Sequence, residues 1–365
     1  MSSNFNIEKV LVAPLDWGLG HATRCIPLIR ALQQAGKKVT IAAEGAQAAL
    51  LGLEFPELPI IPLRGYRVRY SNSKWLLPVT LLLQAAGITR RIKAEQVWLD
   101  QMISLHKIDL VISDNRYGLC SEKIPCIFIT HQLTIKAPFV FLEKALQKIN
   151  YRYINRFTCC WVPDSAGDHN LAGNLSHPDT MPAVPVHYIG LLARFSMQDA
   201  VKKFDCAVLL SGPEPQRTIL EQKIIRGLQN ARGRFLLVRG KPGTDETLFA
   251  GDHVTVKNHL PEAALREAIL QSEYIISRSG YTTVMELAVL QKKSILVPTP
   301  GQTEQEYLAS RLARDHFCLA ASQDDFDFNH LYEMAKSYNY QSTSFPVFED
   351  SQIAMLLELS LTRQS

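Results

Sequence analysis

A buried strand, a turn of small residues and a helix follow one another near residue 280, an order that suits phosphate binding. The apolar run at residues 274–276 predicts a parallel strand, and Ser279 and Gly280 follow it. Small residues let the backbone approach a ligand closely. A helix predicted from about Thr283 to Leu290 would add backbone N–H groups and a positive dipole end. We expect a metal-free diphosphate site at Ser279, Gly280, Thr282 and Thr283.

Glu286 and a later polar loop have the chemistry to bind sugars. A carboxylate at Glu286, within about the first turn of the helix, could accept both hydroxyls of a ribose. The loop after the next predicted strand, residues 294–297, could face a hexose, because it carries Gln302, Thr303, Glu304, Gln305 and Glu306. Phosphate, ribose and hexose sites in this order describe a nucleotide sugar.

Each of these features also has an interpretation without a ligand. Thr283 and Glu286 have the spacing of a capping box, which stabilises a helix N-terminus by itself. The turn at Gly280 could be ordinary punctuation between strand and helix, and residues 302–306 could be a solvated loop. The ordered succession of the features favours the ligand site.

His21 is the candidate for acid–base chemistry. It follows Gly18 and Gly20 after the apolar strand predicted at residues 9–13, and a helix is predicted at residues 22–34. In open parallel sheets, ligands bind at this carboxyl edge. The helix dipole disfavours imidazolium, so His21 should be neutral and able to accept a proton. The alternative is a histidine that only caps the helix or packs in the loop.

The same glycine loop is a poor match to dinucleotide and P-loop patterns. The pattern G-x-G-x-x-G would need glycine in place of Thr23, and no Gly-Lys-Ser/Thr sequence closes the loop. Glu44 does end the second predicted strand, where a ribose-binding acid would lie. An NAD-dependent dehydrogenase therefore stays open as an alternative.

Two further strands bring an aspartate and a second histidine to the same sheet edge. Residues 109–113 and 125–130 are apolar and predict buried strands that end at Asp114 and His131. Asp114 could orient an imidazole and stabilise its cation during proton transfer. Its pairing with Asn115 could equally mark a plain turn.

The elements that must position these residues form two α/β domains. Repeated strand–helix–strand patterns predict parallel sheets covered by helices. We expect an N-terminal domain at residues 1–192, a second domain at residues 204–345, and a final helix within residues 346–365 that crosses back to the first domain. After the first strand of the second domain, Gly212 and Arg217 could contact phosphate, although two prolines there also predict a rigid turn.

Composition excludes several classes of function. The 365 residues suit about two domains, and 39 basic against 35 acidic residues give a net charge of only +4, too little to indicate nucleic-acid binding. Seven scattered cysteines without metal-ligand spacing indicate reduced thiols. With no signal-peptide pattern at the start of the chain, we expect a cytoplasmic location.

One apolar stretch, residues 75–86, has cations on both sides. Arg64, Arg67 and Arg69 precede it, and Arg90, Arg91 and Lys93 follow it. This arrangement is typical of peripheral contact with a membrane surface. A core helix with a charged end is the alternative, and the stretch is too short to span a bilayer.

The segments SRSGYTTVMELA and ILVPTPGQTEQEYLA resemble the donor-binding region of GT-B glycosyltransferases, particularly family 28. The resemblance implies two doubly wound, Rossmann-like domains that face one another across a cleft. It implies that the donor is a nucleotide sugar, with uridine diphosphate as the best candidate nucleotide. The roles that the resemblance carries over fall on Ser279, Gly280, Thr282, Thr283, Glu286, Glu304 and Gln305, with the nucleobase edge near Leu260. Together with Gly212 and Arg217 of the second domain, these are the expected donor-binding residues.

In the first domain, the resemblance implies an acceptor site at Gly18, Gly20 and His131, with His21 and Asp114 as the catalytic pair. The expected reaction is sugar transfer with inversion to an acceptor hydroxyl of a glycan, a lipid-linked compound or a small molecule. We expect no metal and no cofactor. A nucleotide-sugar epimerase, the dehydrogenase above and a non-catalytic nucleotide-sugar binding protein are the alternatives.

Overall fold

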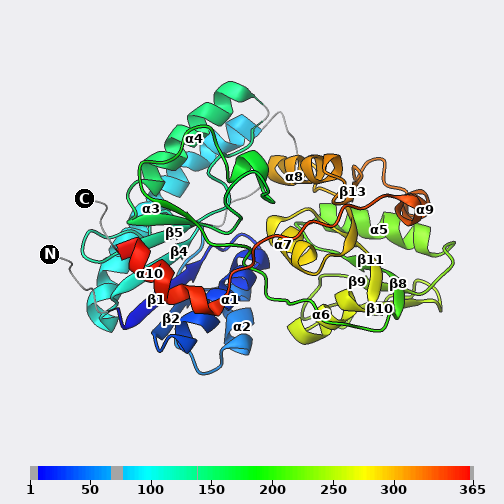
Figure 1. Ribbon diagram of the computed structural model, residues 1–365, viewed down its shortest axis with the longest axis horizontal. Helices are drawn as coiled ribbons and strands as arrows, with labels where there is room; N and C mark the ends of the chain where they lie inside the picture. Colours follow the sequence, from blue (N-terminus) through cyan, green and yellow to red (C-terminus); the bar gives the residue numbers. More distant parts are fainter. Residues whose placement is uncertain (1–6, 67–76, 138, 362–365) are drawn as a thin grey trace. The chain divides into compact units, whose positions relative to one another are not determined.

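The computed structural model describes residues 7–66, 77–137 and 139–361, and gives only the backbone of residues 77–86 (Figure 1). The chain divides into two compact units. Unit 1 consists of Met1–Arg194 together with Phe345–Ser365, and unit 2 is Phe195–Ser344. The apolar stretch at residues 75–86 and the arginines Arg67 and Arg69 lie outside the residues whose side chains are described.

Unit 1 contains a seven-stranded sheet whose paired strands are all parallel, in the order β3-β2-β1-β4-β5-β6-β7. Apolar strand residues and covering helices enclose its core, so most of the strands are buried on both faces. The strands are β1 (Lys9–Pro14), β2 (Lys38–Ala43), β3 (Ile60–Pro62), β4 (Leu110–Asp114), β5 (Cys126–Ile129), β6 (Cys159–Val162) and β7 (Val186–Tyr188).

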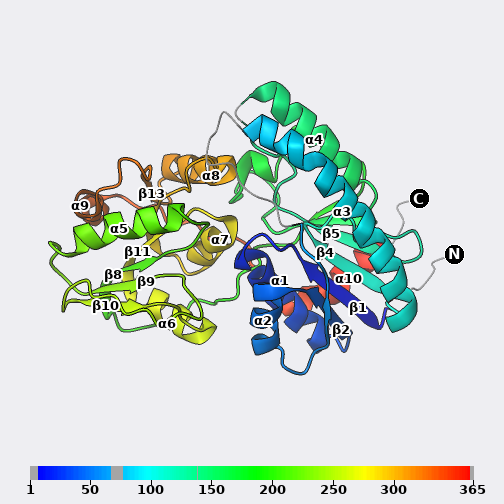
Figure 2. The ribbon, with the colours of Figure 1, turned by 180° about the vertical axis from the view of Figure 1, so that it is seen from behind.

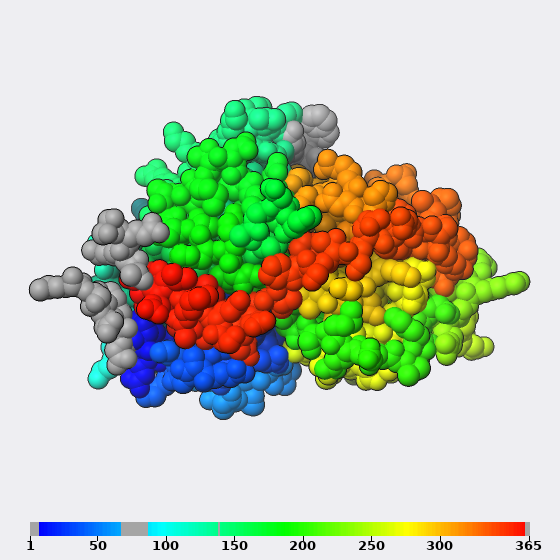
Figure 3. Space-filling model, viewed as in Figure 1, coloured from blue at the N-terminus to red at the C-terminus, as the bar shows by residue number. Residues whose placement is uncertain are grey.

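The helices of unit 1 come from both ends of the chain. They are α1 (Leu19–Gln34), α2 (Gly45–Glu54), α3 (Leu77–His106), α4 (Val140–Ile154), the short 3₁₀ helices η2 (Gly173–Leu175) and η3 (Asp350–Gln352), and α10 (Ile353–Leu361). Trp161 Nε1 donates to Ser360 Oγ over 2.8 Å and fastens α10 to β6. Figure 3 shows this C-terminal segment in red on the surface of unit 1, next to the blue N-terminal segments.

Unit 2 repeats the design with six strands, in the order β10-β9-β8-β11-β12-β13, again with parallel pairs (Figure 2). The strands are β8 (Phe204–Leu209), β9 (Phe235–Val238), β10 (Val254–Lys257), β11 (Ser272–Ser277), β12 (Lys293–Leu296) and β13 (Leu319–Ala320). The helices are α5 (Gln216–Leu228), α6 (Glu262–Leu270), α7 (Tyr281–Val289), α8 (Thr303–Arg314) and α9 (Phe328–Ser337).

Each sheet has one point where the strand order reverses, and both points carry candidate site residues. In unit 1 the reversal lies between β1 and β4, so the loop before α1 and Asp114 lie at the same carboxyl edge. In unit 2 it lies between β8 and β11, which brings together the loops that contain Gly212 and Gly280. Ligands of open parallel sheets bind at such positions.

Three helices begin earlier than the sequence predicts. The first begins at Leu19, so His21 lies inside its first turn, and α7 begins at Tyr281 rather than near Thr283. The third, α8, begins at Thr303, so residues 303–306 of the predicted polar loop are helical. Before α1, Gly18 has a φ of 76°, which glycine adopts without strain. All seven cysteines are buried and unpaired. Among the described residues, no helix combines the length and apolar character needed to cross a bilayer.

Candidate functional site

The loop that carries His21 is fixed from two sides. Gly18 precedes α1 with φ of 76°, a left-handed conformation that glycine adopts without strain. Gln47 Nε2 donates to the Gly18 carbonyl oxygen over 3.2 Å, and Asp16 Oδ1 accepts the backbone N–H of Tyr66 at 2.9 Å. These contacts hold the first turn of α1, and with it His21, at the edge of the sheet.

His21 and Asp114 form a hydrogen-bonded pair. Asp114 ends β4 opposite Pro14 of β1, and its Oδ2 lies 2.8 Å from His21 Nδ1. The Asp114 side chain is fully buried, whereas 15% of the His21 side chain is exposed. Because an ionised carboxylate only accepts hydrogen bonds, Asp114 favours the tautomer of His21 with its proton on Nδ1 and an unprotonated Nε2. Arg24 Nη2 lies 2.9 Å from the same Nδ1 and, as a donor, competes with Asp114 for it. The arrangement is that of an oriented general base.

Arg24 joins this pair from the next turn of α1. Its Nε donates to Asp114 Oδ1 over 2.9 Å, and its Nη2 also bonds that oxygen. Its Nη1 contacts His131 Nδ1 at 3.1 Å, and the whole residue is only 2% exposed. The guanidinium therefore connects three of the polar side chains at this sheet edge.

The sequence reasoning did not identify Arg24. An arginine in an amphipathic helix usually lies on the solvated face, which is why its type alone gave no signal. Its spacing was informative, however, because Arg24 lies three residues after His21 and therefore on the same helix face.

Burial and charge set the protonation states of this cluster. Burial lowers the pKa of His21 most, and the neighbouring Arg24 charge lowers it further, against the opposing effect of Asp114. For Asp114, burial alone would raise the pKa, but Arg24 and His21 outweigh it, so the carboxyl pKa lies below its ordinary value. At neutral pH the pair therefore consists of a neutral imidazole and a carboxylate.

Glu44, the residue on which the dehydrogenase alternative depended, serves the loop structure. Its Oε1 accepts the backbone N–H of Gly65 at 2.7 Å. A Cβ at Gly65 would clash with Asp16, so the two loops pack in direct contact. This contact between loops accounts for an acid at the end of β2 without a cofactor.

In unit 2, Gly280 is the residue before α7, and no side chain caps this helix end. The capping-box interpretation of Thr283 and Glu286 is therefore wrong, because Thr283 is already the third helical residue. Glu286 lies in the second turn rather than the first and is 5% exposed. Thr282 and Thr283 are half-buried in the first turn, at the positive end of the helix dipole.

Arg278 is a second functional candidate that sequence reasoning missed. It is 2% exposed, and within the described residues its guanidinium donates only to neutral oxygens, among them the carbonyls of Val297 and Pro298 and Gln323 Oε1. Burial without a carboxylate lowers its pKa to about 10, so it is still charged at pH 7. The sequence does carry a signal for this role, because Arg278 stands between two serines at the end of a buried strand.

Two buried donors meet beside Gly212. Arg278 Nε and Thr299 Oγ1 have no hydrogen-bond partner among the described residues. A Cβ added at Gly212 would lie 3.9 Å from that Nε and 3.5 Å from that Oγ1. Gly212 itself is exposed and has a φ of 99°, a backbone conformation that residues with a side chain adopt only with strain. The arrangement has the donors that an oxyanion needs.

Several residues predicted to bind the nucleotide sugar form hydrogen bonds with one another inside unit 2. Ser279 Oγ donates to the carbonyl oxygen of Gln305 over 2.8 Å. The Gln305 side chain accepts from the backbone N–H of Thr299 at 2.9 Å and donates to Gln302. These bonds hold the loop before α8 against the turn before α7. Glu304 and Leu260 are half-buried, Glu304 in the first turn of α8 and Leu260 in the loop after β10.

Arg217 lies in the core of unit 2. It is 3% exposed, its Nε lies 2.6 Å from Glu214 Oε1, and its Nη1 lies 3.3 Å from Glu221 Oε2. Its charge is therefore balanced by two carboxylates inside the unit, and Arg278 is the better-placed cation for a phosphate.

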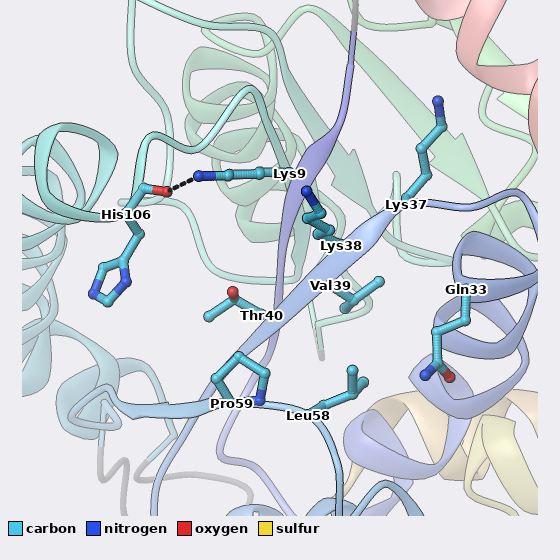
Figure 4. Close-up of a pocket in the computed structure, with 9 residues that line it drawn as sticks. All are labelled: Lys9, Gln33, Lys37, Lys38, Val39, Thr40, Leu58, Pro59 and His106. Atoms are coloured by element: carbon cyan, nitrogen blue, oxygen red, sulfur yellow. Dashed lines mark hydrogen bonds between the residues drawn. The ribbon is translucent and has the colours of Figure 1, made fainter.

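The structure offers no metal site within the described residues, and a cavity in unit 1 lies away from these sites. Among the described residues, no group of three or more His, Cys, Asp or Glu side chains has metal-binding geometry. The cavity, of about 360 Å³, lies at the amino edge of the unit 1 sheet (Figure 4). Its cations diverge: Lys9 Nζ donates to the His106 carbonyl, Lys37 to Ile7 and Lys38 to Glu8. They form no common binding site.

Comparison with known proteins points to one family. The glycosyltransferase family 28 C-terminal domain matches residues 229–351, which include α7, the turn at Gly280 before it and the loop before α8. A UDP-N-acetylglucosamine–N-acetylmuramyl-(pentapeptide) pyrophosphoryl-undecaprenol N-acetylglucosamine transferase of Methylobacterium radiotolerans is 29% identical over 45% of this chain and 46% of that protein. The chain thus aligns with about half the length of this relative. An uncharacterized glycosyltransferase of Methanosarcina acetivorans is 22% identical over 82% of this chain and 81% of its own.

Solved structures match nearly the whole chain. The glycosyltransferase SnogD from Streptomyces nogalater aligns with a TM-score of 0.62 at 15% identity, over 97% of this chain and 100% of its own. MurG of Acinetobacter baumannii aligns with a TM-score of 0.53 at 15% identity, over 91% and 90%. These similarities confirm the expected fold, two parallel-sheet α/β domains of the GT-B type, and the resemblance to family 28.

Proposed function

We propose that this protein, a GT-B protein with the C-terminal domain of glycosyltransferase family 28, transfers a sugar from a nucleoside diphosphate to an acceptor hydroxyl. UDP-N-acetylglucosamine is the donor in the printed name of its relative, and a UDP-sugar is the donor that we propose here. The single observation that carries the proposal is the paired set of edge sites: an oriented base at His21 in unit 1, and phosphate-type donors around Gly212 and α7 in unit 2.

The proposed reaction inverts the anomeric carbon. His21 Nε2 accepts the proton of the acceptor hydroxyl while the oxygen of that hydroxyl bonds to the anomeric carbon. The bond from that carbon to the phosphate oxygen breaks, and the nucleoside diphosphate leaves with the electron pair. Asp114 stabilises the imidazolium that forms, and the amino end of α7 with Arg278 stabilises the negative charge of the leaving group.

In unit 2, each part of the nucleotide sugar is assigned to its own residues. The diphosphate would lie at Gly212, Gly280 and the first turn of α7, and the ribose at Glu286. The base edge would lie near Leu260 and the sugar near Glu304. Gln305 orders these loops through its bonds to Thr299 and Gln302, which is a positioning role.

Nucleotide binding tests the proposal. Uridine diphosphate at a hundred times its Kd should stabilise the fold by about 2.7 kcal/mol, which raises the Tm by roughly 5–10 °C. Glu286→Ala should lose most of this shift, because the ribose contact is removed. His21→Gln, a change in the other unit, should keep it. If no uridine, guanosine or thymidine diphosphate derivative raises the Tm of the wild type, the donor site is misassigned.

We also propose that the enzyme works in the cytoplasm and contacts a membrane surface peripherally. An exposed apolar cluster stands at the start of α4, where Phe139, Val140 and Phe141 are 42%, 69% and 73% exposed. The Phe139 and Phe141 rings stack with centroids 5.6 Å apart, and Lys144 and Lys148 follow exposed on the same helix. Apolar residues beside lysines suit an anionic bilayer.

Vesicle binding tests this contact. The protein should co-sediment with vesicles that contain anionic lipid, and less so at high salt. Phe141→Ser should reduce the bound fraction, while Ile149→Ser, a change at an exposed position two turns along α4, serves as the matched control. Equal sedimentation of the wild type and Phe141→Ser would place the contact elsewhere.

A further inference from the structure

Two lysines share one pair of carbonyl oxygens at the amino edge of the unit 2 sheet. Lys292 Nζ donates to the carbonyl oxygens of Leu270 and Ser272 at 2.9 and 3.0 Å. Lys202 Nζ donates to the same two oxygens at 3.4 and 2.8 Å. Because each oxygen is within hydrogen-bond reach of both nitrogens, the two nitrogens lie close together, and two ammonium charges there repel.

The one acid beside this pair offsets its repulsion only in part. Lys292 is only 8% exposed and forms no ion pair within the part of the chain that the structure describes. Glu273, on β11, lies 2.9 Å from Lys293 and 3.6 Å from Lys202, so it pairs with one of the two lysines and not with Lys292. Burial, followed by the nearby Lys202, lowers the pKa of Lys292 to about 7. An excess of positive charge is built into this place.

A cavity of about 230 Å³ opens at these side chains. It is lined by Lys202, Glu273, Lys292 and Lys293, and by residues 197–200, the segment that leads into β8. Asp199 is the other acid of the lining, and it is exposed. Unlike the cations of the larger cavity in unit 1, Lys202 and Lys292 converge on one point.

We propose that this cavity binds a phosphate-type oxyanion, either inorganic phosphate or the phosphate group of a small metabolite, between Lys202 and Lys292. An ammonium group has three donors, and the two carbonyls take two of them on each lysine. The third hydrogen of Lys292 is left for an anion, and Lys202 also faces Glu273 at 3.6 Å. The anion would replace mutual repulsion by attraction to both lysines, and would favour the charged form of Lys292. The site lies at the amino ends of β11 and β12, the edge opposite to Gly280, so it is separate from the proposed donor site.

Calorimetric titration with sodium phosphate at pH 7.5 and constant ionic strength tests the inference, with sodium chloride as the blank. The wild type should bind phosphate with uptake of protons, so the measured heat should change between buffers of different ionisation enthalpy. Lys292→Met and Lys202→Met should each raise the Kd at least tenfold and abolish the proton uptake. Lys257→Met is the control, because that exposed lysine ends β10, lies outside the cavity lining and should leave both readouts unchanged.

The outcomes separate this site from the donor site and identify its ligand. Glu286→Ala should retain phosphate binding, and Lys292→Met should retain the response to uridine diphosphate. Tighter binding of glycerol 3-phosphate than of phosphate would identify a metabolite as the ligand, and the reverse order would identify the free ion. Phosphate binding that is absent in the wild type, or unchanged in both Lys202→Met and Lys292→Met, would overturn the inference. Lys202 is half exposed, so its variant keeps the test valid even if Lys292→Met fails to fold.

Discussion

Arg24 donates a hydrogen bond from Nη1 to Nδ1 of His131 over 3.1 Å. Its Nη2 lies 2.9 Å from Nδ1 of His21, and its Nε donates to Asp114 Oδ1. An arginine only donates, so the guanidinium favours Nδ1 of His21 as an acceptor, whereas Asp114 Oδ2, at 2.8 Å, favours a proton on the same nitrogen. One buried cation thus contacts both histidines and the aspartate at this sheet edge.

Replacing Arg24 by methionine should move the acidic limb of the activity profile to higher pH. The Arg24 charge is one of the causes that lower the pKa of His21, so its removal raises that pKa. The unprotonated base is then lost at a higher pH. The profile of kcat/KM for nucleotide release from the sugar donor measures this shift.

The same substitution carries a stability cost, which a second variant controls. Removing one partner of a buried ion pair costs about 3–5 kcal/mol. Arg24→Lys keeps the charge but loses the forked contact, so its acidic limb should stay closer to that of the wild type. A folded Arg24→Met protein with an unmoved limb would show that Arg24 has no influence on His21.

Replacing His21 by glutamine should slow turnover without weakening donor binding. Loss of a general base costs about 10²–10⁴ in rate, and glutamine has no comparable basicity. Since the donor contacts lie in unit 2, the thermal shift with uridine diphosphate should persist. Equal turnover in wild type and His21→Gln would assign the base elsewhere, with His131 as the next candidate to substitute.

Removal of divalent metal should leave activity unchanged. The proposed site stabilises the leaving diphosphate with a helix terminus and Arg278, and the described residues contain no acidic cluster that fits a metal. Turnover should therefore be equal before and after treatment with EDTA. Activity that EDTA abolishes and magnesium restores would contradict the proposed mechanism.

Much of the architecture could be predicted because buried parallel strands are continuous apolar runs. The strands predicted at residues 9–13 and 109–113 are β1 and β4, each within one residue of the predicted bounds. Helix starts were less predictable: α7 begins two residues before Thr283, at a point that no capping side chain marks. That small shift also removed the capping-box interpretation of Glu286.

Polar residues inside the candidate site were harder to predict, since their partners are distant in sequence. His21 and Asp114 were singled out because each follows a buried strand. Arg24 meets Asp114 from 90 residues away, and Arg278 donates to carbonyls beyond the next helix, contacts that periodicity does not reveal. Arg217 shows the converse case. It follows a glycine loop in the sequence, but its carboxylate partners Glu214 and Glu221 hold its side chain in the core of unit 2.

Replacing Lys292 by methionine should stabilise the phosphate-free protein, most strongly at neutral and lower pH. The folded-state pKa of about 7 lies below the ordinary value of 10.5, so between these two values the unfolded chain binds more protons. Stability contributed by this group therefore rises with pH through that window, and its penalty is largest below pH 7. Methionine has no proton to lose, and its gain of about 1–3 kcal/mol at pH 7 should shrink as the pH approaches 10. Urea unfolding of both proteins at several pH values measures the difference, and a gain that grows with pH would show that Lys292 is charged and well stabilised in the folded protein.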